Sequence, residues 1–559
     1  MGIFINRGNA DFQRILNGEY VDKTGLIAVV NKTLFSEQSM SCVTRCRRFG
    51  KSMAAKMLCA YYDSSCDSRS LFAGLEAERD ASFEKHLNKY PVLYIDMTDF
   101  ITRYKGDDSI VSHIDREVRT EVHTAFPDTP AEEGDDLMAL LLRIVLKTQK
   151  PFFFIIDEWD AICREFSPTP GPSRRGEGSG YNKANGQHTG LYTPLPSVGG
   201  AGGGAYDSYV NWLRRMFKSV SANTAFAGVY MTGILPIKKY DTQSALNNFL
   251  EYSMVEPRKM ASFFGFTKDE VRTLAARHQM DFAELEAWYD GYQIGDEPSM
   301  FNPNSVMQAV DIGRCRSFWA STGAFNVVSG YISRNFKGLK DDVIYLLSGG
   351  RVKVNTTKFQ NDLSVVNSRD DVLTVLIHLG YLSFDWRRNE CYVPNYEVKG
   401  ELSNAVEESH WDIIAEALQR SEQLLEDTIA GDEEAVARAV EMAHSDDTSI
   451  LSYNSENSLS CVISLAYYYA QNDYHVHREY ASGKGFADLV LIPRRDDGHP
   501  AIIIELKKDR AVQTGVDQIK EKNYPQKVAE YAGDILLVAI NYDTQSKQHT
   551  CQIERWAKE

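Results

Sequence analysis

The sequence lacks the features of a secreted, membrane-spanning or zinc-stabilised protein. No apolar run reaches the roughly 20 residues that a membrane-spanning helix needs. The N-terminal stretch MGIFINRGNADFQRIL has no basic segment followed by an apolar one, so we expect no signal peptide. The nine cysteines form no CxxC pair and no cluster with histidine, which argues against a structural zinc site. We expect a cytoplasmic protein with reduced thiols and no membrane partner.

Positive charge is also scarce. Lys and Arg number 61 against 77 Asp and Glu, which leaves a net charge of -16. This balance argues against a surface coated for nonspecific nucleic-acid binding. Two local basic groups remain, one at Arg45, Arg47 and Arg48 and the other at Lys507, Lys508, Arg510, Lys520, Lys522 and Lys527. The second group fits a nucleic-acid groove and a solvated helix face equally well.

The chain is long enough for several domains. A length of 559 residues exceeds what one hydrophobic core usually supports. We expect an α/β protein with an N-terminal domain over 1–255, a helical lid or winged-helix-like region over 256–400, an acidic helical connector over 401–450 and a second α/β domain over 451–559.

Apolar segments alternate with helical ones in the N-terminal part. Strands are predicted at 40–44, 91–97, 152–156 and 225–235, and a helix at 51–62. Residues 152–156 are apolar throughout, as expected for a strand buried on both faces. This alternation predicts a mostly parallel sheet with flanking helices.

Residues 167–205 interrupt the alternation. They are rich in Gly, Pro and Ser and nearly empty of large aliphatic side chains. Such a segment cannot bury enough apolar surface to offset its chain entropy, so we predict a disordered low-complexity insertion. We assign it no chemistry, and a regulatory or binding loop is the alternative.

Helical spacing dominates the middle of the chain, and strands return near its end. Helices are predicted at 268–278, 282–289, 304–310, 372–382 and through the acidic stretch 402–445. From about residue 453 the predicted order is helix 456–469, strands 475–480, 487–493 and 501–507, helix 514–531 and strand 535–540. This order predicts a compact α/β unit.

The segment Arg45-Cys46-Arg47-Arg48-Phe49-Gly50-Lys51-Ser52 has the ending of a phosphate-binding loop. Gly50 supplies backbone freedom, Lys51 supplies the charge for the terminal phosphates of ATP, and Ser52 supplies a hydroxyl for Mg2+. The usual pattern has glycine at the position of Arg45, but a predicted strand before the loop and a helix after it support the assignment. A Gly-Lys-Ser turn without function is the alternative.

Acidic residues follow the predicted strand 152–156. Asp157 would hold the magnesium ion directly or through water, and Glu158 would polarise the attacking water. Thr232, at the end of the next strand, could sense the terminal phosphate. Asp160 either joins the acidic cluster or has a structural role, which we favour. Arg47 and Arg48 contact phosphates, here or on a neighbouring subunit, or form a solvated pair.

A second set of acidic residues lies near the C-terminus. Asp488 starts an apolar strand, and Glu505 and Lys507 are one residue apart, so on a strand they point to one face. A hairpin between these strands would bring Asp488 and Glu505 together as Mg2+ ligands, with Lys507 near the attacking water. Glu456 is a further candidate ligand, and Gln518 a supporting residue. A surface hairpin with ordinary charges is the alternative.

Both halves resemble known families. The motifs VDKTGLI at 21–27, RRFGKS at 47–52, IDEWD at 156–160 and MTGIL at 231–235 resemble the AAA-ATPase-like proteins of many bacteria, as do WYDGY at 288–292 and FNP at 301–303. In that family the first glycine of the loop is normally missing. The segments GFAD at 485–488, IIELK at 503–507 and QIK at 518–520 resemble the PD-(D/E)xK nuclease domain that commonly follows this ATPase.

The resemblance implies an ATP-binding P-loop ATPase fused to a restriction-endonuclease-like α/β domain. It implies ATP and Mg2+ as cofactors, with residues 47–52, Asp157 and Thr232 at the nucleotide. The resemblance also implies a bacterial source and a role in mobile elements or defence. Related ATPase folds often form rings, so a homo-oligomer is possible.

Three functions are compatible with these patterns. The first is an ATPase coupled to a metal-dependent nuclease that cuts nucleic acid, with DNA favoured over RNA. The second is a nucleotide-dependent switch whose nuclease-like domain binds nucleic acid or protein without cleaving. The third is a nonfunctional remnant that carries an inserted repeat. The intact Asp488, Glu505 and Lys507 favour the first.

Overall fold

The computed structural model separates into two compact units. The first unit comprises Met1–Gly330 and Val354–Asn395, and the second comprises Tyr331–Lys353 and Tyr396–Glu559. The structure describes residues 2–129, 132, 134–166, 203–237, 246–319, 330, 332, 336, 338–347, 349–359, 366–407, 412–445, 463, 466–467, 469–470, 473–481, 486–493, 498–522, 528 and 534–557. The predicted insertion at 167–205 and the predicted ligand Glu456 therefore lie largely or wholly outside the described residues.

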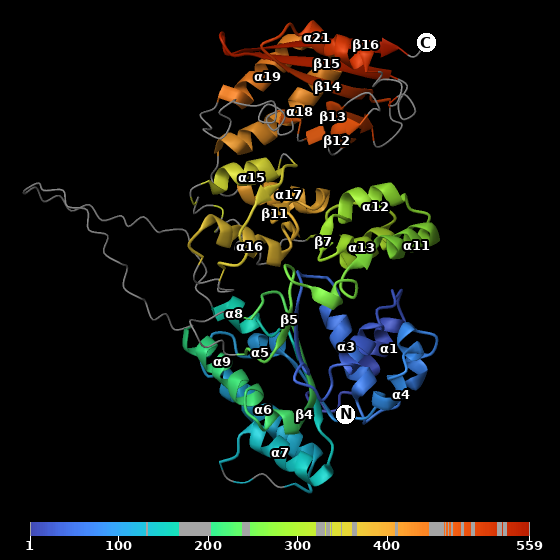
Figure 1. The fold of residues 1–559 in the computed structure, drawn as a ribbon, viewed down its shortest axis with the longest axis vertical. Coiled ribbons are helices and arrows are strands. Elements are labelled where there is room, and N and C mark those ends of the chain that lie inside the picture. The colour runs from blue at the N-terminus through green and yellow to red at the C-terminus, as the bar shows by residue number, and fades with distance from the viewer. Residues whose placement is uncertain are drawn as a thin grey trace, which may run out of the picture. The chain divides into compact units, whose positions relative to one another are not determined.

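A five-stranded parallel sheet forms the centre of the first unit (Figure 1). Its strands are β1 (Met40–Thr44), β2 (Val92–Asp96), β3 (Phe152–Asp157), β4 (Phe226–Gly233) and β5 (Leu250–Tyr252). The order is β2-β3-β4-β1-β5, and every pair is parallel. All residues of β1, β3 and β4 are buried, because helices cover both faces of the sheet. The predicted parallel sheet with flanking helices is confirmed.

Two groups of helices cover the two faces. The first group is α1 (Ala10–Leu16), α2 (Leu26–Asn31), α3 (Lys51–Tyr62) and α4 (Phe83–His86), together with the short 3-10 turns Arg69–Phe72 and Glu76–Arg79. The second group is α5 (Met97–Arg103), α6 (Ile110–Ala125), α7 (Leu137–Thr148), α8 (Ala161–Phe166), α9 (Gly203–Phe217) and α10 (Ala222–Ala225). Aromatic contacts join helix to sheet, for example Tyr62 stacked on Phe153 with ring centroids 4.0 Å apart.

The remainder of the first unit is mostly helical. It contains the 3-10 turn Arg258–Met260, β6 (Phe266–Thr267), α11 (Lys268–His278), α12 (Phe282–Tyr289), β7 (Tyr292–Ile294), β8 (Glu297–Phe301), α13 (Pro303–Ile312), α16 (Arg369–Leu379), β10 (Ser383–Asp385) and β11 (Glu390–Tyr392). A capping box between Thr267 and Glu270 starts α11. The helix predicted over 372–382 ends earlier, because Gly380 takes a left-handed conformation and Ser383 begins a strand.

A mixed five-stranded sheet forms the centre of the second unit. Its strands are β12 (Tyr474–Ala481), β13 (Phe486–Pro493), β14 (Ala501–Lys508), β15 (Asp534–Asp543) and β16 (Gln548–Ala557), in chain order across the sheet. Only the pair β14 and β15 is parallel among these strands. The parallel step is made by a crossover that contains α21 (Gln513–Glu521).

Helices cover this second sheet on both faces. The unit also contains α15 (Leu339–Leu347), β9 (Val352–Lys353), α17 (Tyr396–Glu407), α18 (Asp412–Ala430) and α19 (Glu433–Ser445). The acidic helices α18 and α19 bury Leu424, Leu425, Val436 and Val440 against one face of the sheet, and α21 covers the other. The helices α18 and α19 therefore pack on the core of this unit. The domain boundaries predicted from the sequence stay predictions.

Candidate active sites

The phosphate-loop candidate connects β1 to α3. Gly50 has φ +86°, and an added Cβ would meet no atom within 4 Å, so the backbone conformation rather than crowding requires glycine. Lys51 and Ser52 are the first two residues of α3. The Nζ of Lys51 donates to the carbonyl oxygens of Arg45 and Cys46 at 3.1 Å each, and its side chain is 4% exposed. The lysine therefore lies inside the loop, at the N-terminus of a helix.

Arg45 replaces the usual first glycine and faces the protein interior. Its guanidinium donates to the carbonyl oxygens of Thr44 and Tyr252 at 2.8 Å each and lies over the ring of Phe264. Burial lowers the pKa of Arg45 to about 10. Arg45 thus connects β1 to β5 behind the loop, and it is not part of a basic surface with its neighbours.

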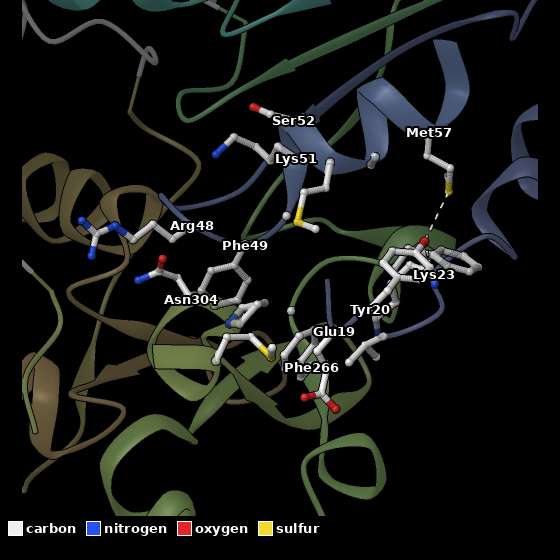
Figure 2. Close-up of a pocket in the computed structure, with 18 of the residues that line it drawn as sticks. Glu19, Tyr20, Lys23, Arg48, Phe49, Lys51, Ser52, Met57, Phe266 and Asn304 are labelled. Atoms are coloured by element: carbon white, nitrogen blue, oxygen red, sulfur yellow. Dashed lines mark hydrogen bonds between the residues drawn. The ribbon is translucent and has the colours of Figure 1, made fainter. Parts of the chain in front are cut away.

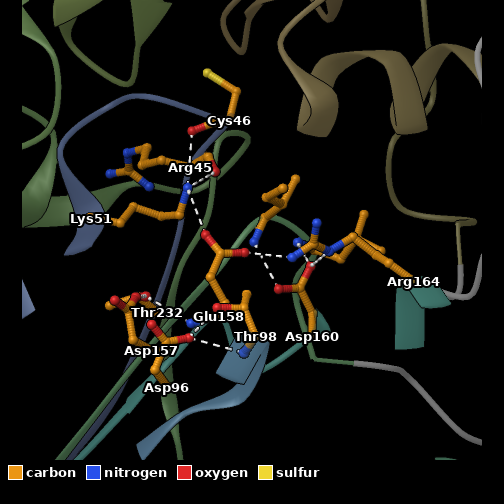
Figure 3. A network of polar contacts seen from close by, with 12 residues as sticks. Arg45, Cys46, Lys51, Asp96, Thr98, Asp157, Glu158, Asp160, Arg164 and Thr232 are labelled. Atoms are coloured by element: carbon orange, nitrogen blue, oxygen red, sulfur yellow. Dashed lines mark hydrogen bonds and ion pairs between the residues drawn. The ribbon is translucent and has the colours of Figure 1, made fainter. Parts of the chain in front are cut away.

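Asp157 ends β3 in a network of hydroxyl groups. One carboxylate oxygen accepts from the hydroxyl of Tyr94 at 3.0 Å, and the other accepts from the hydroxyl of Thr232 on the neighbouring strand β4. The hydroxyl oxygen of Thr232 also accepts from the backbone N–H of Glu158 at 3.3 Å. The predicted trio of Asp157, Glu158 and Thr232 is therefore brought together at the carboxyl end of the sheet (Figure 3).

Glu158 faces the lysine of the loop. Its Oε1 lies 3.8 Å from the Nζ of Lys51, and its Oε2 accepts a hydrogen bond from Arg164. Burial raises the pKa of Glu158, although Lys51 acts in the opposite direction. Asp160 accepts from the backbone N–H groups of Ile234 and Leu235 at 3.2 and 2.9 Å, which is the structural role favoured from the sequence.

A cavity of about 380 Å³ opens beside the loop (Figure 2). Residues 48–52 and Glu158 are among the residues that line it. Its apolar wall includes Met53, Met57, Phe263, Phe266 and Met307, and Tyr20 lies there with its hydroxyl on the sulfur of Met57. A volume of this size with aromatic walls suits a small heterocyclic ligand. Sequence patterns pointed to the loop end, whereas the apolar wall comes from distant segments that only the fold assembles.

The two arginines of the loop differ in position. Arg48 lines the cavity, and its guanidinium donates to the carbonyl oxygen of Phe318. Arg47 is not among the lining residues, and burial together with the nearby Arg164 lowers its pKa. Phe49 also lines the cavity and packs edge-on against Tyr292, with ring centroids 5.1 Å apart.

The second candidate site lies on β13 and β14. Leu489 pairs with Ile504 in the antiparallel register, so Asp488 and Glu505 are the next residues at the same end of the two strands. Oδ2 of Asp488 accepts from the backbone N–H of Leu506 at 2.7 Å. The predicted hairpin geometry is therefore present, and both carboxylates belong to adjacent strands.

Glu505 is buried among polar partners. Its Oε1 accepts from Lys507 Nζ at 2.9 Å and from the side-chain amide of Gln518 on α21. Its Oε2 is buried and has no hydrogen-bond partner among the described residues. Burial raises the pKa of Glu505, the hydrogen bond from Lys507 opposes that rise, and Asp488 adds to it. A buried carboxylate oxygen with no partner is costly, and a bound cation would remove that cost.

The donor atoms fit magnesium at both sites. Carboxylate and hydroxyl oxygens are the ligands that Mg2+ prefers. At the second site the Oε2 of Glu505 has no hydrogen-bond partner among the described residues, and the carboxylate of Asp488 stands on the adjacent strand. At the first site Ser52 lines the cavity, and Asp157 ends β3, which lies on the other side of β4 from the strand that leads into the loop. Within the part of the chain that the structure describes, no group of three or more His, Cys, Asp or Glu side chains has metal-binding geometry.

Comparison with protein-family models matches the two ends of the chain. Residues 7–171 match the model described as Predicted AAA-ATPase, and residues 455–553 match the PD-(D/E)XK nuclease superfamily. The chain joins an AAA-ATPase-like domain to a PD-(D/E)XK nuclease superfamily domain. The two matches cover the loop with Asp157 and Glu158 in the first domain and Asp488, Glu505 and Lys507 in the second.

Two further comparisons add little. No curated protein matches the chain. Among solved structures, the ORC2 protein of Aeropyrum pernix in its ADP form is similar at a TM-score of 0.27 and 10% identity, over 73% of this chain and 99% of that one. None of the helices in the described residues is long and apolar enough to cross a membrane.

Proposed function

We propose that the AAA-ATPase-like domain binds and hydrolyses ATP and that the nuclease-superfamily domain cleaves nucleic acid under its control. The observation that carries the proposal is the buried Oε2 of Glu505, which lacks a partner among the described residues, on a carboxylate that contacts Lys507 through Oε1 and interacts with the charge of Asp488. A domain that only binds has no reason to keep this costly arrangement. The first domain adds a cavity with an apolar wall, whose lining includes Lys51 and Glu158.

At the ATP site, the apolar wall of the cavity would hold the adenine ring, and Lys51 would hold the terminal phosphates. Glu158 would take the proton of the attacking water while the bond between the terminal phosphorus and the leaving ADP oxygen breaks. Ser52 and Asp157 would hold Mg2+, which supplies positive charge to the phosphate oxygens when bound. Thr232 fixes the direction of the Asp157 carboxylate through its hydroxyl.

At the nuclease site, Asp488 and Glu505 would hold Mg2+, with Glu456 as a further ligand. Lys507 would orient the attacking water, whose oxygen bonds to phosphorus as a phosphodiester P–O bond breaks. Gln518 keeps Glu505 in place from the side of α21. The proposal includes the finer expectations of the sequence: DNA as substrate rather than RNA, a homo-oligomer, and a bacterial cytoplasmic role in mobile elements or defence.

The test uses labelled DNA and RNA with Mg2+ or Mn2+, with and without ATP. Wild-type protein is compared with Asp488→Ala. Cleavage that disappears in the variant supports the nuclease, and its dependence on ATP shows control by the first domain. Well-folded, ATP-binding protein that cuts neither substrate would contradict the nuclease half.

The second candidate is a nucleotide-dependent switch whose nuclease-like domain only binds. The net charge of -16 favours it in the form in which the bound partner is a protein, because an acidic protein attracts nucleic acid poorly. Under this function Asp488→Ala leaves both ATP binding and partner binding unchanged. Under the first function the same variant keeps ATP binding and loses cleavage.

A further inference from the structure

We propose that Arg164 is a positioning residue for ATP hydrolysis, which holds the carboxylate of Glu158 beside the terminal phosphate of the nucleotide. This inference rests on the proposed ATPase function. Arg164 lies on α8, six residues after Glu158 in the chain. Nothing in the sequence motif distinguishes it from an ordinary helix-surface arginine, so its position becomes visible only in the structure.

The guanidinium of Arg164 contacts two carboxylates at once (Figure 3). Its Nη2 donates to Oε2 of Glu158 at 2.5 Å, and its Nε lies 3.2 Å from Oδ2 of Asp160. The side chain is 17% exposed. Because a guanidinium is planar and rigid, it holds two oxygens in fixed relative positions, which the ammonium of a lysine does not.

Asp160 supplies the fixed end of this arrangement. It is fully buried, and its two oxygens accept from the backbone N–H groups of Ile234 and Leu235. Those N–H groups follow β4 directly. The carboxylate of Asp160 is therefore fixed by two backbone hydrogen bonds, and it holds the guanidinium near the end of the sheet by charge attraction, since the Nε of Arg164 makes no hydrogen bond to it. Glu158 takes its orientation from that support.

The backbone of Glu158 reinforces the geometry. Its φ of +54° is left-handed, a conformation that costs energy for a residue with a side chain. The N–H of Glu158 donates to Thr232, and the N–H of Trp159 donates to the carbonyl oxygen of Thr232 at 2.8 Å. The turn thus directs the carboxylate of Glu158 toward Lys51 and Arg164 instead of back along the strand.

The charges explain why such support is needed. In the structure the carboxylate of Glu158 lies between two cations, Lys51 and Arg164. The terminal phosphate of a bound nucleotide would take over the ammonium of Lys51 and place negative charge next to Glu158. Like charges repel strongly in a buried site. Arg47 also acts on Glu158 through its charge, but Arg164 is the cation that donates a hydrogen bond to this carboxylate, and that hydrogen bond keeps it within reach of the attacking water.

The experiment measures ATP turnover and ATP affinity in four variants of the full chain: Arg164→Ala, Arg164→Lys, Glu158→Gln and the double variant Glu158→Gln/Arg164→Ala. We expect Arg164→Ala to lower kcat by roughly 100-fold, within the range for loss of a positioned base, and to change ATP affinity much less. Arg164→Lys should retain part of the turnover. The double variant should be no slower than Glu158→Gln, because Arg164 acts through Glu158.

Arg143 provides a matched control. It lies on α7, is 25% exposed and also pairs with two carboxylates, those of Glu132 and Asp135. Arg143→Ala should turn over ATP at the wild-type rate. Thermal unfolding of every variant identifies losses of ATP turnover that come from misfolding. If Arg164→Ala does not fold, the turnover of Arg164→Lys tests the inference in its place.

The outcomes separate this inference from the proposed function. A wild-type protein that does not hydrolyse ATP overturns both. Wild-type turnover that Arg164→Ala and Arg164→Lys retain in full overturns the inference alone. A double variant that is clearly slower than Glu158→Gln also overturns it, because Arg164 would then act on the phosphate or the fold independently. A fall in kcat with nearly unchanged affinity, and no further fall in the double variant, supports it.

Discussion

The ammonium of Lys51 lies 3.8 Å from a carboxylate oxygen of Glu158, although the two residues lie on opposite sides of β4 in the sheet order. The first begins the helix after β1, and the second follows β3. Parallel strands bring their carboxyl ends to one edge of a sheet, which is where open α/β sheets bind ligands. The pair therefore marks the point at which nucleotide phosphate would meet Glu158, the residue that we propose to activate water.

Lys51→Ala should weaken ATP binding. Loss of a charged hydrogen-bond donor typically costs about 1.5–3 kcal/mol, which corresponds to roughly a 10- to 100-fold rise in Kd. Equilibrium titration with a fluorescent ATP analogue measures the change. Lys56→Ala, on the same helix but outside the cavity lining, is the control and should bind as the wild type does. Unchanged affinity in Lys51→Ala would refute the phosphate-loop assignment.

Gly50→Ala should affect binding through the backbone. An added Cβ meets no neighbour, so its cost comes from the left-handed φ of +86° and amounts to about 1–2 kcal/mol. We expect a modest fall in the free energy of unfolding or a rearranged loop with weaker ATP binding. Chemical denaturation and ATP titration distinguish the two. Gly400→Ala, which has open space and no positive φ, is the control, and an equal effect there would contradict this explanation.

Asp488 has a structural contact as well as its proposed role at the metal. Its Oδ2 accepts from the N–H of Leu506, so Asp488→Ala would leave that donor without this partner, at a cost of about 1–3 kcal/mol. Asp488→Asn retains an acceptor but loses the charge. We expect both variants to lose cleavage and only Asp488→Ala to lose stability. Comparison of unfolding curves with cleavage assays tests this, and equal stability of the two variants would be evidence against the contact.

Glu505 should make the stability of the metal-free protein depend on pH. Burial raises its pKa, so the folded protein binds this proton more tightly than the unfolded chain does. The contribution to the free energy of unfolding is full below the ordinary carboxyl pKa and is lost as the pH rises through the raised value. Thermal unfolding of chelator-treated protein, from about pH 4 to about pH 8, should therefore show a slope that Glu505→Gln lacks.

Addition of Mg2+ or Mn2+ at neutral pH should reverse this loss. A ligand that binds only the folded state stabilises it, and a concentration 100 times Kd adds about 2.7 kcal/mol. The wild-type melting temperature should rise with metal concentration, whereas Glu505→Gln and Asp488→Asn should respond weakly. Equal responses in all three proteins would place the metal elsewhere.

Much of the fold was predictable because strands that are buried on both faces, such as β3 and β4, have nearly continuous apolar sequences. The strand β16 was missed for the opposite reason. Its sequence, QHTCQIERWA, is mostly polar and contains no continuous apolar run, and it forms a strand by pairing with the apolar strand β15. The helix predicted over 514–531 is present as α21 from Gln513 to Glu521, and most of the rest of the predicted range lies outside the described residues.

The candidate site residues were predictable where they lie close together in the sequence, in short motifs. Asp157 with Glu158, and Glu505 with Lys507, stand next to apolar strands and were found by that contrast. Arg45 was grouped with Arg47 and Arg48 as a basic surface, although it is buried, because the residues next to an arginine in the sequence do not show whether it is buried. Arg164 was missed because the positions of its partners depend on the fold. Glu158 is oriented by a left-handed turn after β3, and Asp160 is held by the backbone that follows β4.

The strand order has a consequence for the crossover between β3 and β4. Asp157, Glu158, Asp160 and Arg164 precede residues 167–202 and Thr232 follows them, yet direct pairing of the two strands holds the groups together. The entropy of closing a loop rises slowly with its length. A change in the length of this crossover should therefore leave the pairing of β3 with β4 in place, and with it the groups that we propose for ATP hydrolysis.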